Sequence, residues 1–363
     1  MTTRREFLTI SAGALALQAS GLAAITPSNR PLDILVLGGT GFLGPHEINY
    51  ALARGHRVTM FNRGSNVGMY GDAVEELIGN RDSNIDAGLS VLAGDRTWDV
   101  VIDNSGYVPR HVRDSAELLK GRCRRYIYVS TVAVYDFDAG TSVFPESAKL
   151  ADLTDPSVEE VTGETYGPLK AECDRIVRSI LGETCTVVRP TYVVGPGDHT
   201  DRFTYYVDTV NRGGDVLAPP GPEQEVQWVD ARDLCPWIVT LAENDTPGIF
   251  NAAGPASPVD RSGVMWGLRA LTAEPVSFFW PDPELLSELD INMPMMPMGS
   301  EHFVNTASMA AGIEYRSLAD TATATLEWWE SQTAERRGNP RRWPSAEQVE
   351  TAIARIKAAQ STG

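Results

Sequence analysis

The sequence predicts an α/β protein built on a doubly wound parallel sheet, followed by a smaller C-terminal part that binds the substrate. Three observations predict this class. Short apolar runs alternate with helical patterns, a glycine-rich loop joins the first run to the first helix, and the alternation weakens only beyond residue 195. With 363 residues, 42% of them hydrophobic, the chain is long enough to bury such a core.

The elements of the sheet follow from the hydrophobic pattern. Apolar runs bounded by turn residues predict strands, and segments with helical spacing between them predict crossover helices. The expected strands cover 34–37, 58–61, 75–78, 100–103, 126–130 and 185–189. The expected helices cover 43–54, 85–93, 110–119 and 166–181.

Beyond this alternation the chain becomes irregular. Prolines crowd into 218–222 and again into 293–298. We therefore expect residues 32–195 to form the sheet domain and residues 196–345 a mixed substrate-binding part whose strands return to that domain. A helical pattern near the C-terminus predicts a final helix and tail over 346–363.

The first 24 residues have the pattern of an export signal. Arg4 and Arg5 precede an uncharged, mildly apolar run over 8–24, and this pair of arginines resembles the twin-arginine type. An ordinary amphipathic helix would need a polar face, which this run lacks. We expect export by the twin-arginine machinery to the periplasm, with 25–31 as a linker. An uncleaved signal that anchors the protein is the alternative.

Charge and cysteine content exclude several classes of partner. The formal net charge is −17 and the pI is near 4.7, so nucleic acid and anionic membranes would be repelled. The four cysteines are scattered, with neither a CxxC pair nor a histidine cluster, so we expect no metal site and no dense disulfide framework.

The loop over 38–44 has the context of a dinucleotide-binding loop, because it follows the first strand and opens the first helix. Gly38 permits the tight turn, Gly41 lets the backbone approach a pyrophosphate, and Gly44 lets the helix pack on the strand. The helix N-terminus then faces the phosphates. The loop residues expected to bind the cofactor are Gly38, Thr40, Gly41, Phe42, Leu43 and Gly44.

The ends of the next strands bear on which dinucleotide is bound. Where NAD-binding proteins carry an acidic residue, the second strand ends in 62–64 without a carboxylate, and Arg63 is suited to the 2′-phosphate of NADP. This favours NADP over NAD, both of which remain open. Asn80 and Arg81 are expected at the adenine edge. The residues expected along the middle of the cofactor are Asn104, Ser105 and Gly106.

Two candidate catalytic residues lie four positions apart. Tyr166 and Lys170 share one face of the predicted helix at 166–181. An ammonium close to the phenol lowers its pKa, which lets it exchange a proton with a substrate hydroxyl or carbonyl. Ser130 and Thr131 follow the fifth strand, so either hydroxyl can hydrogen-bond the reacting oxygen.

Taken together, these motifs resemble the extended short-chain dehydrogenases, the NAD-dependent epimerase/dehydratase superfamily, over roughly 34–255. The resemblance implies a Rossmann fold, with Thr131 as catalytic hydroxyl, Tyr166 as general acid/base and Lys170 holding the nicotinamide ribose. It also implies a homodimer. The segments that carry it are 38–44, 129–135, 166–170, 189–198 and 227–234. The cofactor contacts it adds are Pro190, Tyr192 and Val193.

Within that superfamily the sequence looks most like an atypical branch. Segments 61–64 and 103–109 resemble those of isoflavone-reductase-like proteins and of chloroplast RNA-binding relatives. Asn80 departs from the pattern, since the family usually has an aspartate there, and this departure affects the expected adenine contact.

The residues after Thr131 bear on the reaction. Dehydratases of this superfamily carry an Asp-Glu pair where this chain has Val132 and Ala133, and eliminating water needs its own acid and base. This leaves hydride transfer at a hydroxyl of a sugar or sugar nucleotide, as an epimerase or a dehydrogenase/reductase. An epimerase recycles its cofactor, which suits an exported enzyme. The alternatives are a reductase of a non-sugar carbonyl and a catalytically silent nucleotide-binding protein.

The substrate pocket is the least specified part of the site. Four side chains are candidates for it, and ordinary packing or solvated charge is the alternative for each. They are Tyr107, Arg202, Trp228 and Arg232.

Overall fold

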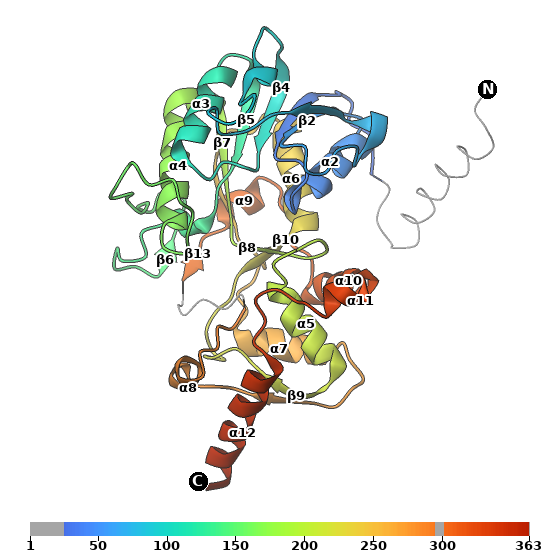
Figure 1. Ribbon diagram of the computed structural model, residues 1–363, viewed down its shortest axis with the longest axis vertical. Helices are drawn as coiled ribbons and strands as arrows, with labels where there is room; N and C mark the ends of the chain where they lie inside the picture. Colours follow the sequence, from blue (N-terminus) through green and yellow to red (C-terminus); the bar gives the residue numbers. More distant parts are fainter. Residues whose placement is uncertain (1–24, 295–300, 363) are drawn as a thin grey trace, which may run out of the picture.

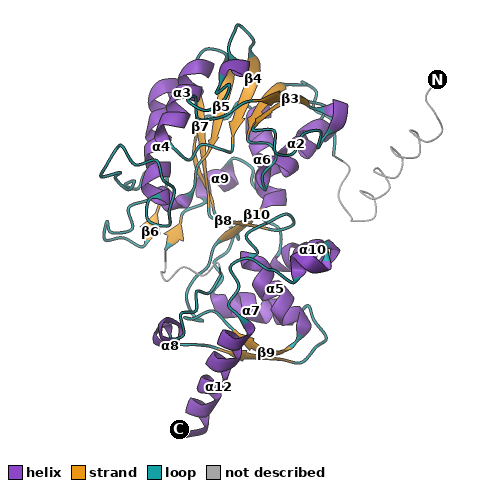
Figure 2. Ribbon diagram, viewed as in Figure 1, coloured by secondary structure: helices purple, strands orange, loops and turns teal. Residues whose placement is uncertain are grey.

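The computed structural model describes residues 25–294 and 301–362. The predicted export signal over 1–24 lies outside the described residues. The described chain forms two lobes, one around a central sheet and one made mainly of helices and loops (Figures 1 and 2). The chain passes from the sheet lobe to the second lobe where β7 is followed by β8 (Figure 1).

The central sheet has seven strands in the order β11-β7-β5-β4-β1-β2-β3, and all its neighbours pair in parallel. The prediction of a doubly wound parallel sheet is thus confirmed. The strands are β1 (Asp33–Leu37), β2 (Arg57–Asn62), β3 (Glu75–Ile78), β4 (Trp98–Asp103), β5 (Cys123–Val129), β7 (Cys185–Pro190) and β11 (Gly248–Ala252). The last of these comes from residues beyond 195.

Helices cover both faces of the sheet. Alternate side chains of β1 point to opposite faces, as the two-residue period of a strand requires. Ile34 and Val36 pack in the core under α2 and α6, whereas Leu35 and Leu37 pack in the core under α3 and α4. These helices are α2 (Leu43–Ala53), α3 (Pro109–Leu119), α4 (Tyr166–Leu181) and α6 (Ala231–Glu243).

The helix predicted over 85–93 is wrong. The structure has a single 3-10 turn there, η2 (Ser90–Leu92), preceded by turns. Asp86 and Gly88 both have φ of 52°, a left-handed conformation that a right-handed helix cannot contain. Leu92 is nevertheless buried in the core of the sheet lobe, so the apolar spacing reflects packing rather than a helix.

The second lobe has its own apolar core, which includes Phe203 and Met265. Its strands form two-stranded parallel sheets, β8 (Tyr192–Val194) with β10 (Trp228–Asp230) and β9 (Gly214–Leu217) with β12 (Val276–Phe279). Its helices are α5 (Arg202–Arg212), α7 (Arg261–Arg269), α8 (Pro283–Glu288), α10 (Leu318–Ser331), α11 (Ala334–Arg337) and α12 (Ala346–Thr362). The last of them projects from the lobe (Figure 1).

Short elements complete the chain. A small sheet pairs β6 (Val143–Phe144) with β13 (His302–Phe303), and α9 (Thr306–Ala310) packs against β11. The remaining 3-10 turns are η1 (Gly71–Ala73), η3 (Val132–Val134) and η4 (Gly182–Thr184). Within the described ranges, no helix combines the length and apolar content needed to cross a membrane.

Candidate active site

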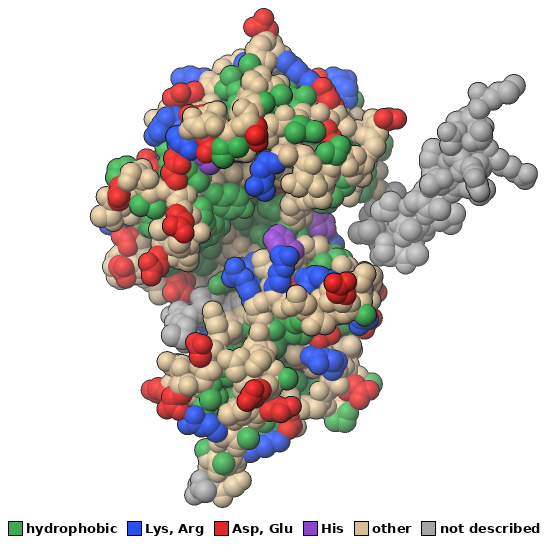
Figure 3. All heavy atoms as spheres, in the orientation of Figure 1, with side chains coloured by type: hydrophobic (Ala, Val, Ile, Leu, Met, Phe, Trp, Pro, Cys, Tyr) green, Lys and Arg blue, Asp and Glu red, His purple; other side chains and the backbone are tan. Residues whose placement is uncertain are grey.

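The candidate site lies at the carboxyl ends of the central strands, where parallel sheets of this type bind ligands. β1 runs into the glycine loop, β4 into 104–107 and β5 into Ser130 and Thr131. The same edge of the sheet faces the second lobe, because β7 continues into β8 there. Figure 3 shows the surface hollowed between the lobes, with apolar side chains deep in the hollow and basic and histidine side chains along the second lobe.

The backbone of the glycine loop fits a pyrophosphate. Gly38 has φ of +92°, and a Cβ at Gly44 would lie 2.3 Å from the carbonyl oxygen of Gly39, so neither position accepts a side chain. At Gly41, by contrast, no described atom lies within 4 Å of where a Cβ would be. The N-cap of α2 is Phe42, which has no side-chain acceptor, so the first turn keeps N–H groups for an anion.

Arg81 does not lie where the sequence placed it. Its Nη1 donates to Asp103 and Ser105 at 2.5 and 3.2 Å, and its Nη2 donates to Asp103 and Ser115, both at 3.0 Å. Arg81 and Asp103 are buried, and these contacts use every Nη hydrogen of the guanidinium. The predicted adenine contact of Arg81 is therefore corrected to a buried ion pair that fixes the end of β4.

The other two residues expected around the adenosine have different surroundings. Arg63, directly after β2, is exposed, and its guanidinium has no hydrogen bond or ion pair within the part of the chain that the structure describes. The side-chain oxygen of Asn80 accepts from the backbone N–H of Asp82 at 3.0 Å, which closes a turn after β3. Arg63 thus remains available to a ligand.

The residues after β4 are tied to the glycine loop and to α4. The hydroxyl of Ser105 donates to the carbonyl of Leu37 at 3.2 Å, and a Cβ on Gly38 would lie 2.7 Å from the Cβ of Ser105. The carbonyl of Gly106 accepts from Lys170 Nζ at 2.8 Å and from the hydroxyl of Tyr128 at 2.7 Å. This segment is therefore held rigidly between the loop and the catalytic helix.

Tyr166 and Thr131 meet at the mouth of the site. Burial raises the pKa of Tyr166 to about 12, and a hydrogen bond from Thr131 and the positive charge of Arg202 lower it in part. The ring of Tyr107 lies beside that of Tyr166, with centroids 6.4 Å apart. The predicted substrate residue Tyr107 and the predicted general acid/base Tyr166 therefore lie side by side.

Lys170 is placed differently from the simple expectation. It is buried, and its Nζ donates at 2.8 Å to the carbonyls of Gly106 and of Val129. Burial lowers the pKa of Lys170 to about 8. Its Nζ is thus held by two backbone carbonyls, and its predicted action on the Tyr166 phenol stays a prediction. One of its three N–H bonds remains for a ligand such as a ribose hydroxyl.

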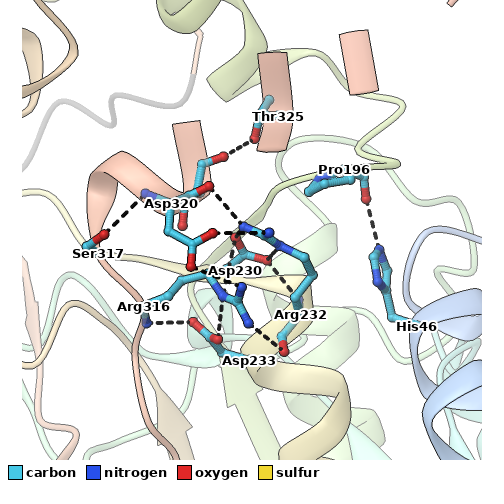
Figure 4. A network of polar contacts seen from close by, with 10 residues as sticks. His46, Pro196, Asp230, Arg232, Asp233, Arg316, Ser317, Asp320 and Thr325 are labelled. Atoms are coloured by element: carbon cyan, nitrogen blue, oxygen red, sulfur yellow. Dashed lines mark hydrogen bonds and ion pairs between the residues drawn. The ribbon is translucent and has the colours of Figure 1, made fainter. Parts of the chain in front are cut away.

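Two of the candidate pocket residues have structural roles. Trp228 is 4% exposed and packs in the core of the second lobe. Arg232 donates to both carboxylate oxygens of Asp230, at 3.0 and 2.7 Å, and pairs with Asp320 at 3.3 Å (Figure 4). These carboxylates already neutralise the charge of Arg232. Its predicted role in the substrate pocket is therefore corrected to an ion pair that links α6 to α10.

The remaining predicted contacts lie at the end of β7 and on β8. Pro190 ends β7 and is buried, whereas Tyr192 and Val193 are partly exposed on β8. The guanidinium of Arg202 lies 5.0 Å above the ring of Tyr192. Among the predicted pocket residues of the second lobe, Trp228 is buried in the core and Arg232 is paired. Arg202 alone of these three has a charge without an ion pair in the described part of the chain.

Sequence reasoning missed Glu47. It lies in the first turns of α2 and is 1% exposed, and its carboxylate accepts from Asn104 Nδ2 at 2.5 Å. Burial raises the pKa of Glu47 to about 7. The sequence did contain a signal for a buried carboxylate: Glu47 lies three residues after Gly44, on the face of the predicted helix that the apolar pattern assigns to the core.

Replacing Glu47 with glutamine tests this burial. The folded state holds the proton up to about pH 7, whereas an unfolded chain releases it near 4.5, so wild-type stability is lost as the pH rises through that window, by about 3 kcal/mol at most. We expect Glu47→Gln to lack this loss when urea unfolding is measured from pH 5 to pH 8. The exposed Glu117→Gln serves as control, and equal pH dependence in all three proteins would refute the assignment.

Comparisons with known proteins identify the family of the chain. A family model described as the NAD dependent epimerase/dehydratase family matches residues 34–253. Among curated proteins, the chloroplast stem-loop binding protein of 41 kDa b from Arabidopsis thaliana is 24% identical over 316 residues, which cover 81% of this chain and 76% of that protein.

Solved structures share the fold. The Bordetella bronchiseptica enzyme WbmG in complex with NAD and UDP has a TM-score of 0.62 at 16% identity, covering 83% of this chain and 95% of that one. UDP-glucuronic acid 4-epimerase from Bacillus cereus in complex with NAD has a TM-score of 0.62 at 15% identity, covering 83% and 99%. dTDP-glucose 4,6-dehydratase from Bacillus anthracis in complex with NAD has a TM-score of 0.61 at 17% identity, covering 83% and 97%.

Proposed function

This chain is an enzyme of the NAD dependent epimerase/dehydratase family, and we propose that it moves a hydride between a bound nicotinamide dinucleotide and a hydroxyl-bearing carbon of a sugar or sugar nucleotide. One observation carries the proposal: Thr131, Tyr166 and Lys170 converge beside a glycine loop whose backbone suits a pyrophosphate. The solved neighbours that contain NAD with UDP or with a UDP-sugar support the substrate class.

Each residue has a definable task. When bound, the dinucleotide supplies the hydride acceptor. The glycine loop and the first turn of α2 hold its pyrophosphate, and the free N–H of Lys170 is suited to its ribose. In its phenolate form, which the hydrogen bond from Thr131 and the charge of Arg202 favour, Tyr166 Oη removes the proton of the substrate hydroxyl. Thr131 Oγ1 hydrogen-bonds the same substrate oxygen. The apolar floor of the hollow excludes water from the exchange.

The residues around Thr131 favour simple hydride transfer over dehydration. Val132 and Ala133 occupy the turn η3, and neither has a group that can act as acid or base. An epimerase, which returns the hydride to the same substrate, fits best with an enzyme that works away from a nicotinamide pool. A dehydrogenase/reductase is the second form of this proposal.

The stem-loop binding relative favours one further candidate, a nucleotide-fold protein without turnover. A net charge of −17 opposes RNA binding, since phosphates would be repelled at long range. The intact set of Thr131, Tyr166 and Lys170 opposes loss of catalysis. We therefore prefer the enzyme.

The decisive experiment is a substrate panel. The protein loaded with NAD or NADP is incubated with UDP-sugars, dTDP-sugars and free sugars, and the products are separated and identified by NMR. Epimerised or oxidised sugar supports the proposal. Conversion of none of them, together with reduction of non-sugar carbonyls in a parallel panel supplied with NADH or NADPH, would transfer support to the carbonyl reductase.

Arg63 carries a proposed preference for NADP. The side chain is exposed beside the end of β2, and a guanidinium suits the 2′-phosphate. We expect Arg63→Ser to weaken NADP binding by about 10-fold or more and to leave NAD binding unchanged, because a charged hydrogen bond is worth about 1.5–3 kcal/mol. Calorimetric titration with both dinucleotides measures this. Equal loss for the two would refute a 2′-phosphate contact.

Export is a separate part of the proposal. The arginine pair and the uncharged run after it support transport by the twin-arginine route to the periplasm, with an uncleaved anchor as the alternative. Cell fractionation of the wild-type chain and of a variant with Arg4 and Arg5 changed to lysine distinguishes export from retention. A homodimer is proposed from the family resemblance, and light scattering on the purified protein measures it.

A further inference from the structure

Arg202 differs from the other arginines around the second lobe. Arg232 pairs with Asp230 at 2.7 Å, and Arg336 pairs with Asp201 at 2.5 Å. Arg202 begins α5, and its Nε donates to Thr200 Oγ1 at 2.8 Å. Within 25–294 and 301–362, neither of its Nη groups has a hydrogen bond or ion pair. The guanidinium therefore presents two unpaired Nη groups and a charge that is in no ion pair with a carboxylate of the described chain.

The direction of this guanidinium is fixed by its neighbours. The hydroxyl of Thr200 donates to Asp198 Oδ1 at 2.5 Å, and the backbone N–H of Thr200 donates to the same oxygen at 2.9 Å. Asp198 is 1% exposed, so this anchor is buried. The guanidinium also lies over the ring of Tyr192, 5.0 Å from its centroid. A side chain oriented in advance loses little entropy when a ligand binds.

The segment before Arg202 packs against the glycine loop. The carbonyl of Pro196 contacts His46 Nε2 at 2.9 Å, and the ring of Phe42 meets that of His199 edge-on at 6.4 Å. Arg202 is thus held near the cofactor loop. Although burial raises the pKa of Tyr166, the charge of Arg202 acts against that rise, which is consistent with a guanidinium close to the phenol.

From this placement we propose that Arg202 binds an anionic substituent carried by the sugar ring itself, close to the carbon that is oxidised. The inference rests on the proposed function and names its substrate class: an acidic sugar, either a uronate or a ring phosphate. A guanidinium takes two oxygens of a carboxylate or phosphate through parallel N–H bonds, and the two Nη groups of Arg202 offer such a pair.

The test measures binding rather than turnover. Two pairs of probes each differ in the group at one ring carbon: UDP-glucuronic acid against UDP-glucose, and glucose 6-phosphate against glucose. Calorimetric titration of the NAD-loaded chain is performed on the wild type, Arg202→Gln and Arg202→Lys. The matched control is Arg212→Gln, at the other end of α5, where the arginine pairs with Asp208 at 2.9 Å.

We expect the wild type to prefer the acidic member of at least one pair, and Arg202→Gln to lose that preference by about 10- to 100-fold. The neutral member should bind as before. Arg202→Lys should keep part of the preference, because it keeps the charge without the fork. If the glutamine variant fails to fold, the lysine variant decides. The pair that responds identifies a carboxylate or a phosphate as the group bound.

Two results would overturn the inference. The first is equal binding of both members of each pair by the wild type. The second is an Arg202→Gln loss of affinity as large for UDP-glucose as for UDP-glucuronic acid, which would mean that Arg202 binds the diphosphate instead. Failure of the proposed function would show in a different experiment. If no sugar in the substrate panel is converted, the proposed function fails, but the binding titrations can still show a preference that depends on Arg202.

Discussion

A Tyr166→Phe variant should bind the dinucleotide as the wild type does and convert sugar substrates about 10²–10⁴-fold more slowly. The change removes only the hydroxyl that exchanges the proton. The ring stays in place beside Tyr107, with which it packs at 6.4 Å between centroids. Steady-state rates of epimerisation or oxidation, together with a binding titration of the dinucleotide, measure the two expectations separately.

The matched control is Tyr205→Phe, which removes a hydroxyl from a tyrosine buried in the core of the second lobe, away from the sheet. That variant should convert substrate at the wild-type rate. If Tyr166→Phe also retains the wild-type rate, Tyr166 is not the general acid/base. If both variants lose activity alike, the loss reflects damage to packing.

An Arg81→Met variant should lower the free energy of unfolding by about 3–5 kcal/mol, the usual cost of leaving one partner of a buried ion pair alone. Asp103 is fully buried and would keep the Tyr126 hydroxyl at 2.7 Å and the backbone N–H of Ser105 at 3.1 Å as donors. Urea unfolding of the purified variant measures the loss.

Arg57→Met is the control, because Arg57 pairs with Asp33 in an exposed position, where solvent weakens the interaction. Its unfolding midpoint should stay near that of the wild type. An Arg81→Met midpoint equal to that of Arg57→Met would contradict the role of the Arg81–Asp103 pair in fixing the end of β4.

The features that the sequence predicted correctly depend on local patterns. The run before Gly38 is apolar on both faces, as a central parallel strand requires, and the spacing of Tyr166 and Lys170 is a property of one helical turn. The failed helix over 85–93 shows the limit of such patterns. Its apolar positions were real, but Asp86 and Gly88 take left-handed conformations that spacing does not reveal.

The site residues that were misplaced depend on contacts between distant segments. Arg81 pairs with Asp103, 22 residues away, and no local pattern encodes that pairing. Arg232 pairs with Asp320, 88 residues away, but also with Asp230, only two residues before it, so part of its pairing was visible in the sequence. Lys170 was assigned to the right helix face, but its carbonyl partners come from two other strands' ends.

The most direct measurement is the identity of the nucleotide held by the purified protein. The chain is denatured, and the released small molecules are separated and identified by mass spectrometry. This measurement requires no knowledge of the substrate. We predict about one nicotinamide dinucleotide per chain, either retained through purification or acquired on titration with NAD or NADP. A chain that releases none and shows no binding of either dinucleotide at millimolar concentration would contradict the assignment of the loop at 38–44.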